Sequence, residues 1–199
     1  MPALDARPAR IAPGNWVLTT DASDAGQAMR RALHPALPGI FLAVLTLLFG
    51  FGLGVVFGLN EGAIKSRLAA SAAAVEATVY HGDAAAAKPV LDKSWAYMQR
   101  AHLHAGALGT SAVILCVLTA LVGARPVVTR TIGVALGAGA LGYSVFWLWA
   151  GFRAPGLGGT GAAKESLAWL AMPSSGAVVA GTAAVAVLCF VAMARRRTD

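Results

Sequence analysis

Four long apolar runs without Asp, Glu, Lys or Arg constrain the fold of this 199-residue chain more than any other feature. They cover residues 39–59, 101–122, 131–150 and 176–194. A helix of about 20 apolar residues crosses the roughly 30 Å hydrocarbon core of a bilayer. The runs therefore predict an all-α polytopic membrane protein, a four-transmembrane-helix bundle formed by residues 39–194.

The composition agrees with this class. Charged residues make up 13% of the chain, against about 25% in soluble domains, and the mean hydropathy is +0.66. The net charge of +7 comes from basic residues that flank the apolar runs, as membrane topology and anionic headgroups favour. Because no nucleic-acid-binding motif accompanies the charge, we expect a lipid bilayer as the partner and no nucleic acid.

The distribution of basic residues predicts the orientation. The side that would hold both termini carries nine arginines, and the other side carries seven Lys and Arg residues. Since positive charge concentrates in the cytoplasm, we predict a cytoplasmic, partly disordered arm over residues 1–38 and a cytoplasmic tail over 195–199. A short helix is expected from Ser23 to Leu33, capped by Ser23 or Asp21. A bacterial cytoplasmic (inner) membrane is the expected location.

Two connections lie on the opposite side. Residues 60–100 are predicted to form a small extracytoplasmic helical cap, with an amphipathic helix over 61–80 and a turn at His81–Asp83. A second long helix is expected to begin at Pro89, since proline fits a first helical turn. Residues 151–175 are expected to be a glycine-rich loop with a short helix from Lys164 to Met172, after which Pro173 restarts the chain.

Glycines at helical spacing predict the packing faces of the spans. Gly50, Gly54 and Gly58 follow one another at intervals of four and therefore share one face of the first span. Small residues let helix backbones approach each other closely in a membrane. The glycines assigned to helix packing are Gly50, Gly54, Gly58, Gly106, Gly109, Gly133 and Gly137.

Two of the four histidines stand where the second span begins. His102 and His104 diverge by about 200° on a helix, so they cannot chelate one ion from one face. His102 shares its face with Gly106 and Gly109, which leave room for a helix or a flat cofactor, whereas His104 should lean toward headgroups or a neighbouring subunit. The candidate metal ligands are His102, His81 and His104, with Met98, Met172 and Glu165 as helpers.

Three interpretations of these histidines remain open. One is a haem b or a copper or zinc site, although haem b usually takes two axial ligands from facing helices and no other span contains a histidine. Another is an interfacial histidine hydrogen-bonded to a loop carbonyl or to Glu165. The third is a proton relay.

Charged and aromatic side chains flank the glycine-rich loop. Tryptophans concentrate at headgroup depth, and charges at membrane edges reach toward water. A site for an anionic headgroup, a quinone or a partner subunit is therefore a hypothesis for this region. The residues assigned to it are Arg153, Lys164, Glu165, Trp147 and Trp149.

The sequence indicates a function mainly by what its spans lack. No nucleophile motif, carboxylate pair or dinucleotide fingerprint is visible, so we assign no enzymatic activity. Spans without ionisable Asp, Glu, Lys or Arg argue against ion-coupled transport. The leading hypothesis is an accessory subunit or assembly factor of a larger membrane complex, respiratory or redox in kind, or a homo-oligomer. The alternative is a small permease or channel whose mouth is lined by His102, Arg153 and Glu165.

Overall fold

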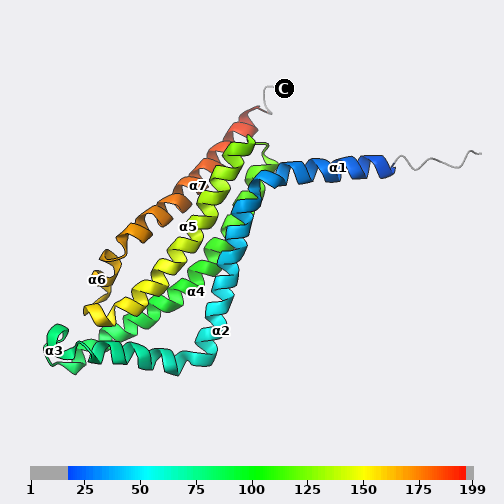
Figure 1. Ribbon diagram of the computed structural model, residues 1–199. Helices are drawn as coiled ribbons and strands as arrows, with labels where there is room; N and C mark the ends of the chain where they lie inside the picture. Colours follow the sequence, from blue (N-terminus) through cyan, green and yellow to red (C-terminus); the bar gives the residue numbers. More distant parts are fainter. Residues whose placement is uncertain (1–17, 196–199) are drawn as a thin grey trace, which may run out of the picture. The chain divides into compact units, whose positions relative to one another are not determined.

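The computed structural model describes residues 18–195, and no strand occurs among them. The elements in chain order are α1 (Leu18–Leu33), η1 (His34–Ala36), α2 (Leu37–Ala73), α3 (Glu76–Val79), α4 (Ala84–Leu121), α5 (Pro126–Arg153), η2 (Pro155–Leu157), α6 (Thr160–Glu165) and α7 (Ala168–Arg195) (Figure 1). The all-α prediction is therefore confirmed. The expectations for residues 1–17 and for Arg196 and Arg197 lie outside the described residues.

The chain divides into two compact units, one up to Arg31 and one from Ala32 onward. In the first unit the predicted short helix is present, but it begins at Leu18, so Asp21 and Ser23 lie inside it and not at its cap. Arg30 and Arg31 occupy its last turn, where positive charge interacts favourably with the helix dipole.

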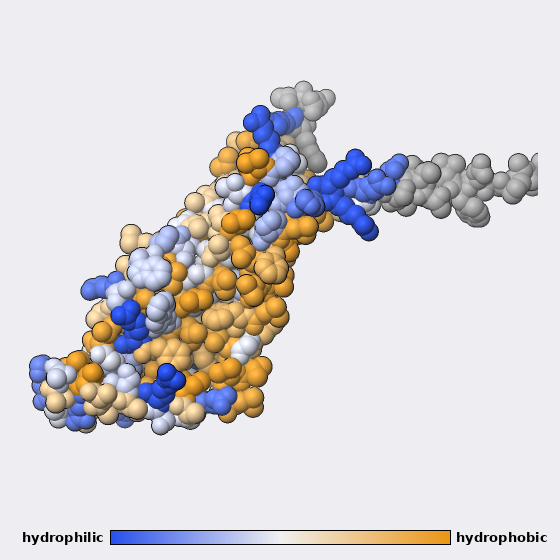
Figure 2. Space-filling view, in the orientation of Figure 1, coloured by the Kyte–Doolittle hydropathy of each residue, from blue (hydrophilic) through white to orange (hydrophobic). Residues whose placement is uncertain are grey.

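Within the described residues, four helices are long and apolar enough to cross a membrane: α2, α4, α5 and α7. Their outward faces carry large apolar side chains, among them Phe51 of α2, and Figure 2 shows these as a broad hydrophobic surface along the helices. A soluble protein would bury such side chains, so the surface indicates an integral membrane protein.

Three of these helices pack on one another, and the fourth lies beside them. α4 packs extensively against α5, and α2 contacts both, whereas α7 contacts mainly α5 (Figure 1). The start of α2 and the end of α7 lie at one end of this unit, and α3 lies at the other. α7 therefore packs along one side of a three-helix group.

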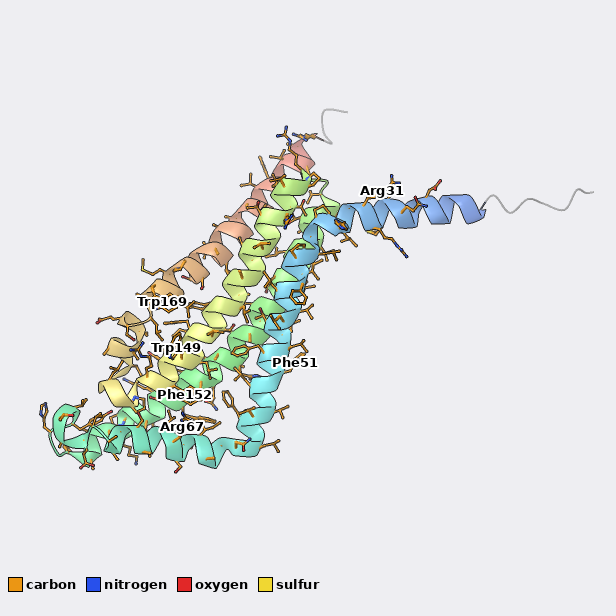
Figure 3. The ribbon with its side chains drawn as sticks, viewed as in Figure 1. Arg31, Phe51, Arg67, Trp149, Phe152 and Trp169 are labelled. Atoms are coloured by element: carbon orange, nitrogen blue, oxygen red, sulfur yellow. The ribbon has the colours of Figure 1, made fainter. Side chains whose placement is uncertain are left out.

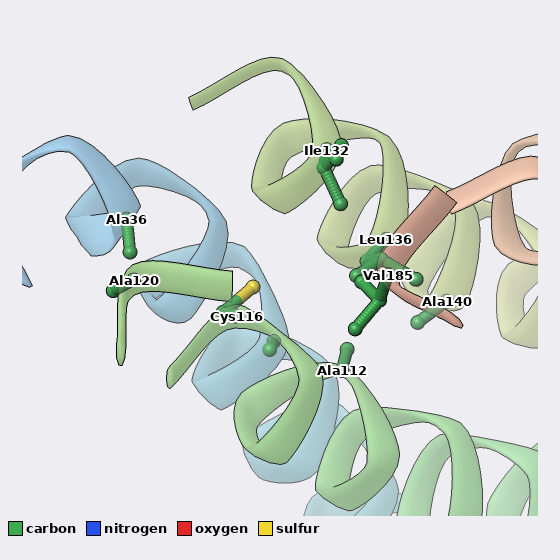
Figure 4. Close-up of a cluster of buried hydrophobic side chains, with 9 residues drawn as sticks. Ala36, Ala112, Cys116, Ala120, Ile132, Leu136, Ala140 and Val185 are labelled. Carbon is green, nitrogen blue, oxygen red and sulfur yellow. The ribbon is translucent and has the colours of Figure 1, made fainter. Parts of the chain in front are cut away.

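Small side chains form the main core. Ala112 and Cys116 of α4 face Ile132 and Leu136 of α5, and Val185 of α7 packs against this group (Figure 4). The alanines of this cluster, such as Ala112 and Ala140, let the backbones approach closely, which strengthens van der Waals contact where no water is present to drive burial. The core thus depends on close backbone packing.

α2 bends at Asn60, whose φ of −129° and ψ of 20° interrupt the helix. The Asn60 side-chain amide donates to the carbonyl oxygen of Val56 at 3.3 Å, so the interruption does not leave that acceptor unpaired. Beyond the bend Leu68 packs with Phe57 and Met98, and the ammonium of Lys65 lies 5.2 Å from the Trp95 ring centroid. The predicted amphipathic helix is therefore present, although it ends at Ala73.

The start of α4 corrects one prediction. The helix begins at Ala84 and not at Pro89, because the Asp83 carboxylate caps it by accepting from the backbone N–H groups of Ala85 and Ala86. Pro89 lies inside the first two turns. The 38-residue helix is about 57 Å long, so it extends well beyond the hydrocarbon core.

The predicted turn at His81–Asp83 is confirmed, and its backbone explains part of the sequence. His81 has a φ of 54° and Gly82 a φ of 78°, both in the left-handed region that the turn requires. The preceding residue, Tyr80, is buried and donates its hydroxyl to the carbonyl oxygen of Pro155 at 2.7 Å. This bond joins the connection before α4 to the connection after α5.

Replacing Tyr80 with phenylalanine should lower the free energy of unfolding by about 1 kcal/mol, because the Pro155 carbonyl loses its donor. Burial raises the pKa of the Tyr80 hydroxyl above its ordinary value of 10.0. The neutral hydroxyl therefore stabilises the fold below about pH 10, and this contribution is lost as the pH rises through the higher pKa. Unfolding in detergent between pH 8 and 11 should show this loss in the native protein and a smaller one in Tyr80→Phe; equal pH profiles would contradict it.

The segment 151–175 is more helical than predicted. α5 continues to Arg153, the glycine-rich stretch folds into η2 and α6, and α7 begins at Ala168, so Pro173 lies within a helix and does not restart the chain. Helices in membranes tolerate proline where side-chain hydroxyls bond to nearby carbonyls. Ser175 donates to the carbonyl oxygen of Ala171 at 2.8 Å, whereas the acceptor that Pro173 leaves without a backbone donor is the carbonyl of Trp169.

Candidate functional site

His102, one of the candidate ligands named from the sequence, belongs to α4, and its side chain contacts α2. Its Nδ1 atom is 2.8 Å from the carbonyl oxygen of Gly50, and a Cβ atom added at Gly54 would lie 3.0 Å from its Cε1 atom. The absence of a side chain at Gly54 therefore makes room for the imidazole ring. The structure brings together His102 and two glycines that sequence spacing had assigned only to packing.

The bond to Gly50 determines which ring nitrogen carries the proton. A carbonyl oxygen only accepts, so Nδ1 donates and, in the neutral ring, Nε2 keeps a lone pair. A metal-bound histidine is often oriented in this way, with one nitrogen bonded to a backbone carbonyl. A polar contact that joins two membrane helices has the same geometry. Of the three interpretations of this histidine, the hydrogen-bonded one has a partner in the structure, but the acceptor is a carbonyl inside α2 and neither a loop carbonyl nor Glu165.

The structure does not gather the proposed helper ligands around His102. His81 is exposed at the turn before α4, and the helix from Ala84 to His102 alone spans about 27 Å. Met98 is fully buried in the core, and Met172 is 73% exposed on α7. Glu165 is exposed in α6. Among the described residues, no three His, Cys, Asp or Glu side chains are grouped as a metal site would need.

His104 corrects a second expectation. Its ring does not lean away from the protein toward headgroups, because it packs against two aromatic side chains of α5: the ring centroids lie 5.3 Å from Tyr143 and 5.8 Å from Trp147. Its Nδ1 atom donates to the carbonyl oxygen of Arg100 at 2.8 Å. His102 and His104 therefore contact different helices, as the 200° divergence predicts.

Arg100 and Tyr97 complete an aromatic–basic cluster with these residues. The Arg100 guanidinium lies 5.4 Å from the Tyr97 ring and 5.2 Å from the Trp147 ring, within cation–π range. The Trp147 indole N–H is buried and has no acceptor among the described residues. Tyr97, Arg100 and His104 follow one another at helical spacing, and this signal in the sequence could have predicted the cluster.

The predicted headgroup site is divided between different faces. Trp147 belongs to the aromatic–basic cluster, whereas Trp149 meets Trp169 of α7 edge to face at 6.2 Å (Figure 3). Lys164 and Glu165 are exposed in α6, and Arg153 is half-buried at the end of α5. Residues two positions apart on a helix diverge by about 200°, so Trp147 and Trp149 do not face one ligand.

Most of the glycines assigned to packing are used between helices of this chain. A Cβ atom at Gly50, Gly109 or Gly137 would lie within 3.0 Å of a neighbouring helix, and the corresponding positions at Gly54 and Gly133 are in contact range. At Gly58 a Cβ atom would meet no atom within 4 Å, so this position is not used between the described helices of this chain. Gly106 also has an open side-chain position, although its backbone nitrogen would lie 3.3 Å from a Cβ atom at Gly50.

The hydroxyl groups of the spans provide little polar surface for a solute. Each of four hydroxyls donates to the carbonyl oxygen four residues earlier in its own helix, as is common in membrane helices. The donors are Thr46, Thr119, Ser144 and Thr182, at 2.7–2.9 Å. These bonds weaken the permease alternative, because those hydroxyls do not line a continuous path.

Comparisons with protein-family models, with curated proteins and with solved structures gave no match to this chain.

Proposed function

We propose that this protein is an accessory subunit or assembly factor that binds another membrane helix through the outer face of α7. The outer face is the side of α7 that points away from α5. Only Ser174, Gly181 and Val185 of this helix are buried. The residues of the outer face, all exposed, are Gly176, Val179, Ala180, Ala183, Val187 and Phe190.

The small residues of the outer face carry this proposal. Gly176, Ala180 and Ala183 recur at intervals of four and three, so they form one stripe, and a Cβ atom at Gly176 would meet no atom within 4 Å. The exposed surface of α2 carries large side chains such as Phe41 and Phe51 beside its open glycines Gly52 and Gly58, as suits contact with lipid. Small residues favour the approach of another helix, so α7 is the better surface for a partner.

Orientation and location follow from the same helices. Four crossings return the chain to its starting side, and Arg125, Arg130 and Arg195 stand at the end where α2 begins and α7 finishes. Positive charge favours the cytoplasm, so we place that end there and the segment 60–100 outside as a cap on the bundle. A bacterial inner membrane fits this arrangement.

Replacing Gly176 with leucine should abolish the association, because the new side chain would hold a partner helix away. Gly52→Leu is the matched control, since Gly52 is also exposed and open but lies on α2. Tagged protein would be purified from native membranes, and its partners quantified. A partner present in stoichiometric amount should be retained by Gly52→Leu and lost by at least tenfold from Gly176→Leu. Equal retention by both variants would reject the outer face as the interface.

The geometry of His102 favours a second candidate function, binding of a haem or of a copper or zinc ion. Its support is the Nε2 lone pair on a ring that Gly50 holds in place. Because the described residues place no group of further metal-ligating side chains at His102, a partner helix would supply the second ligand to the haem or metal. If haem is bound, His102→Ala should remove the Soret band and His104→Ala should largely spare it. Metal analysis should show the same difference for copper or zinc, and a colourless, metal-free preparation from native membranes would reject this candidate.

A further inference from the structure

A groove of 720 Å³ lies where the turn between α4 and α5 meets the last turns of α7. Its walls are apolar and belong to spanning helices, with Leu118 from α4, Val128 from α5 and Leu188 and Val191 from α7. We call this space the α7 groove. Its volume is within the roughly 300–1,000 Å³ that small-molecule sites occupy.

Two arginines border the groove at the end where α4 and α7 finish. Arg125 precedes the first residue of α5 and is exposed, and Arg195 is the last residue of α7. Among the described residues that line the groove, none is Asp or Glu. The α7 groove therefore combines apolar walls with positive charge at the end of the spanning helices.

We propose that the α7 groove binds one phospholipid with an anionic headgroup. The phosphate lies at Arg125 and Arg195, and an acyl chain lies along the apolar walls. Arginine suits this role because its planar guanidinium can donate two parallel hydrogen bonds to a phosphate. The walls favour a lipid over a soluble anion, since a free phosphate would use the arginines and leave the apolar surface uncovered.

The primary test counts bound lipids on the full-length protein by native mass spectrometry in neutral detergent. Phosphatidylglycerol is compared with phosphatidylcholine, and Arg125→Gln with Arg130→Gln. Arg130 is also an exposed arginine of α5, but it does not line the groove, so it is the matched control. Phosphatidylglycerol should bind at least fivefold more tightly than phosphatidylcholine, and Arg125→Gln, unlike Arg130→Gln, should remove that preference. Equal binding of the two lipids would overturn the proposal.

The two cysteines allow a test of location. Cys189 is half-buried and lines the groove, whereas Cys116 is fully buried in the core and serves as an internal control. Phosphatidylglycerol should slow the alkylation of Cys189 by N-ethylmaleimide several-fold, and phosphatidylcholine should not. Protection by inorganic phosphate alone would overturn the proposal in favour of a soluble anion, and protection by both lipids would show that the groove does not select the headgroup.

A second variant covers the case in which Arg125→Gln does not fold. Ala192→Phe keeps both arginines but adds a ring where a half-buried alanine lines the groove. It should bind phosphatidylglycerol at least fivefold more weakly than the native protein. Unchanged binding would show that the lipid lies elsewhere.

Discussion

Replacing Gly39 with alanine is expected to lower the free energy of unfolding by about 3 kcal/mol or more. A Cβ atom at Gly39 would lie 2.3 Å from the carbonyl carbon of Gly133, so the backbones of α2 and α5 would have to separate. Denaturation in mixed micelles would measure the effect.

Two other glycines provide matched controls for this variant. A Cβ atom at Gly133 would meet the Cys116 sulfur at an ordinary 3.4 Å, and one at Gly52 would meet no atom within 4 Å. Gly133→Ala should therefore cost less than about 1 kcal/mol, and Gly52→Ala should be neutral or stabilising, since alanine is the better helix former. Equal stability of all three variants would mean that α2 and α5 do not cross at Gly39.

Replacing Met98 with alanine should cost about 2–5 kcal/mol, because the change leaves a cavity in a packed interior. Met98 is fully buried and contacts Phe57 of α2, and a Cβ atom at Gly151 of α5 would lie 2.7 Å from its Cγ atom. It therefore joins three of the four spanning helices.

Met172 is the control for this variant, because it is the same residue type but is 73% exposed on α7. Met172→Ala should change the stability by less than about 0.5 kcal/mol. Both methionines were candidate helpers of a metal site, so an absorption spectrum of each variant separates packing from ligation. A spectral change without loss of stability in Met98→Ala would contradict its assignment to the core.

The sequence predicted the spanning helices because uncharged apolar runs have few alternatives to a helix in a membrane. Helix ends were less predictable, since single side chains decide them. Asp83 starts α4 five residues before Pro89 by accepting two backbone N–H bonds, and α7 continues past Pro173. Neither effect follows from hydropathy.

For the candidate site, only the features that depend on a single helix could be predicted from the sequence. The faces of α4 separate His102 from His104, and this separation followed directly from residue spacing. The partners did not, because the register between two helices depends on how their surfaces fit. For this reason the pairing of His102 with Gly50 and Gly54 and the packing of His104 on Tyr143 were not predicted.

This pairing also changes how the first-span glycines are interpreted. Spacing assigned Gly54 to helix packing without identifying the helix that packs there, so Gly54→Leu could have been chosen to release a separate subunit. Gly54 instead accommodates His102 of the same chain, so that variant would disturb the α2–α4 contact itself. The outer face of α7 therefore remains the surface on which exposed small residues form a stripe that suits a partner.

Site-specific photo-cross-linking in native membranes tests this central proposal most directly. A photoreactive amino acid would replace Ala183 on the outer face of α7 and, in a separate protein, Gly52 on the exposed face of α2. We predict one discrete protein adduct from position 183 and none above background from position 52. Lipid adducts alone from position 183, or the same protein adducts from both positions, would contradict the assignment of the outer face to a partner helix.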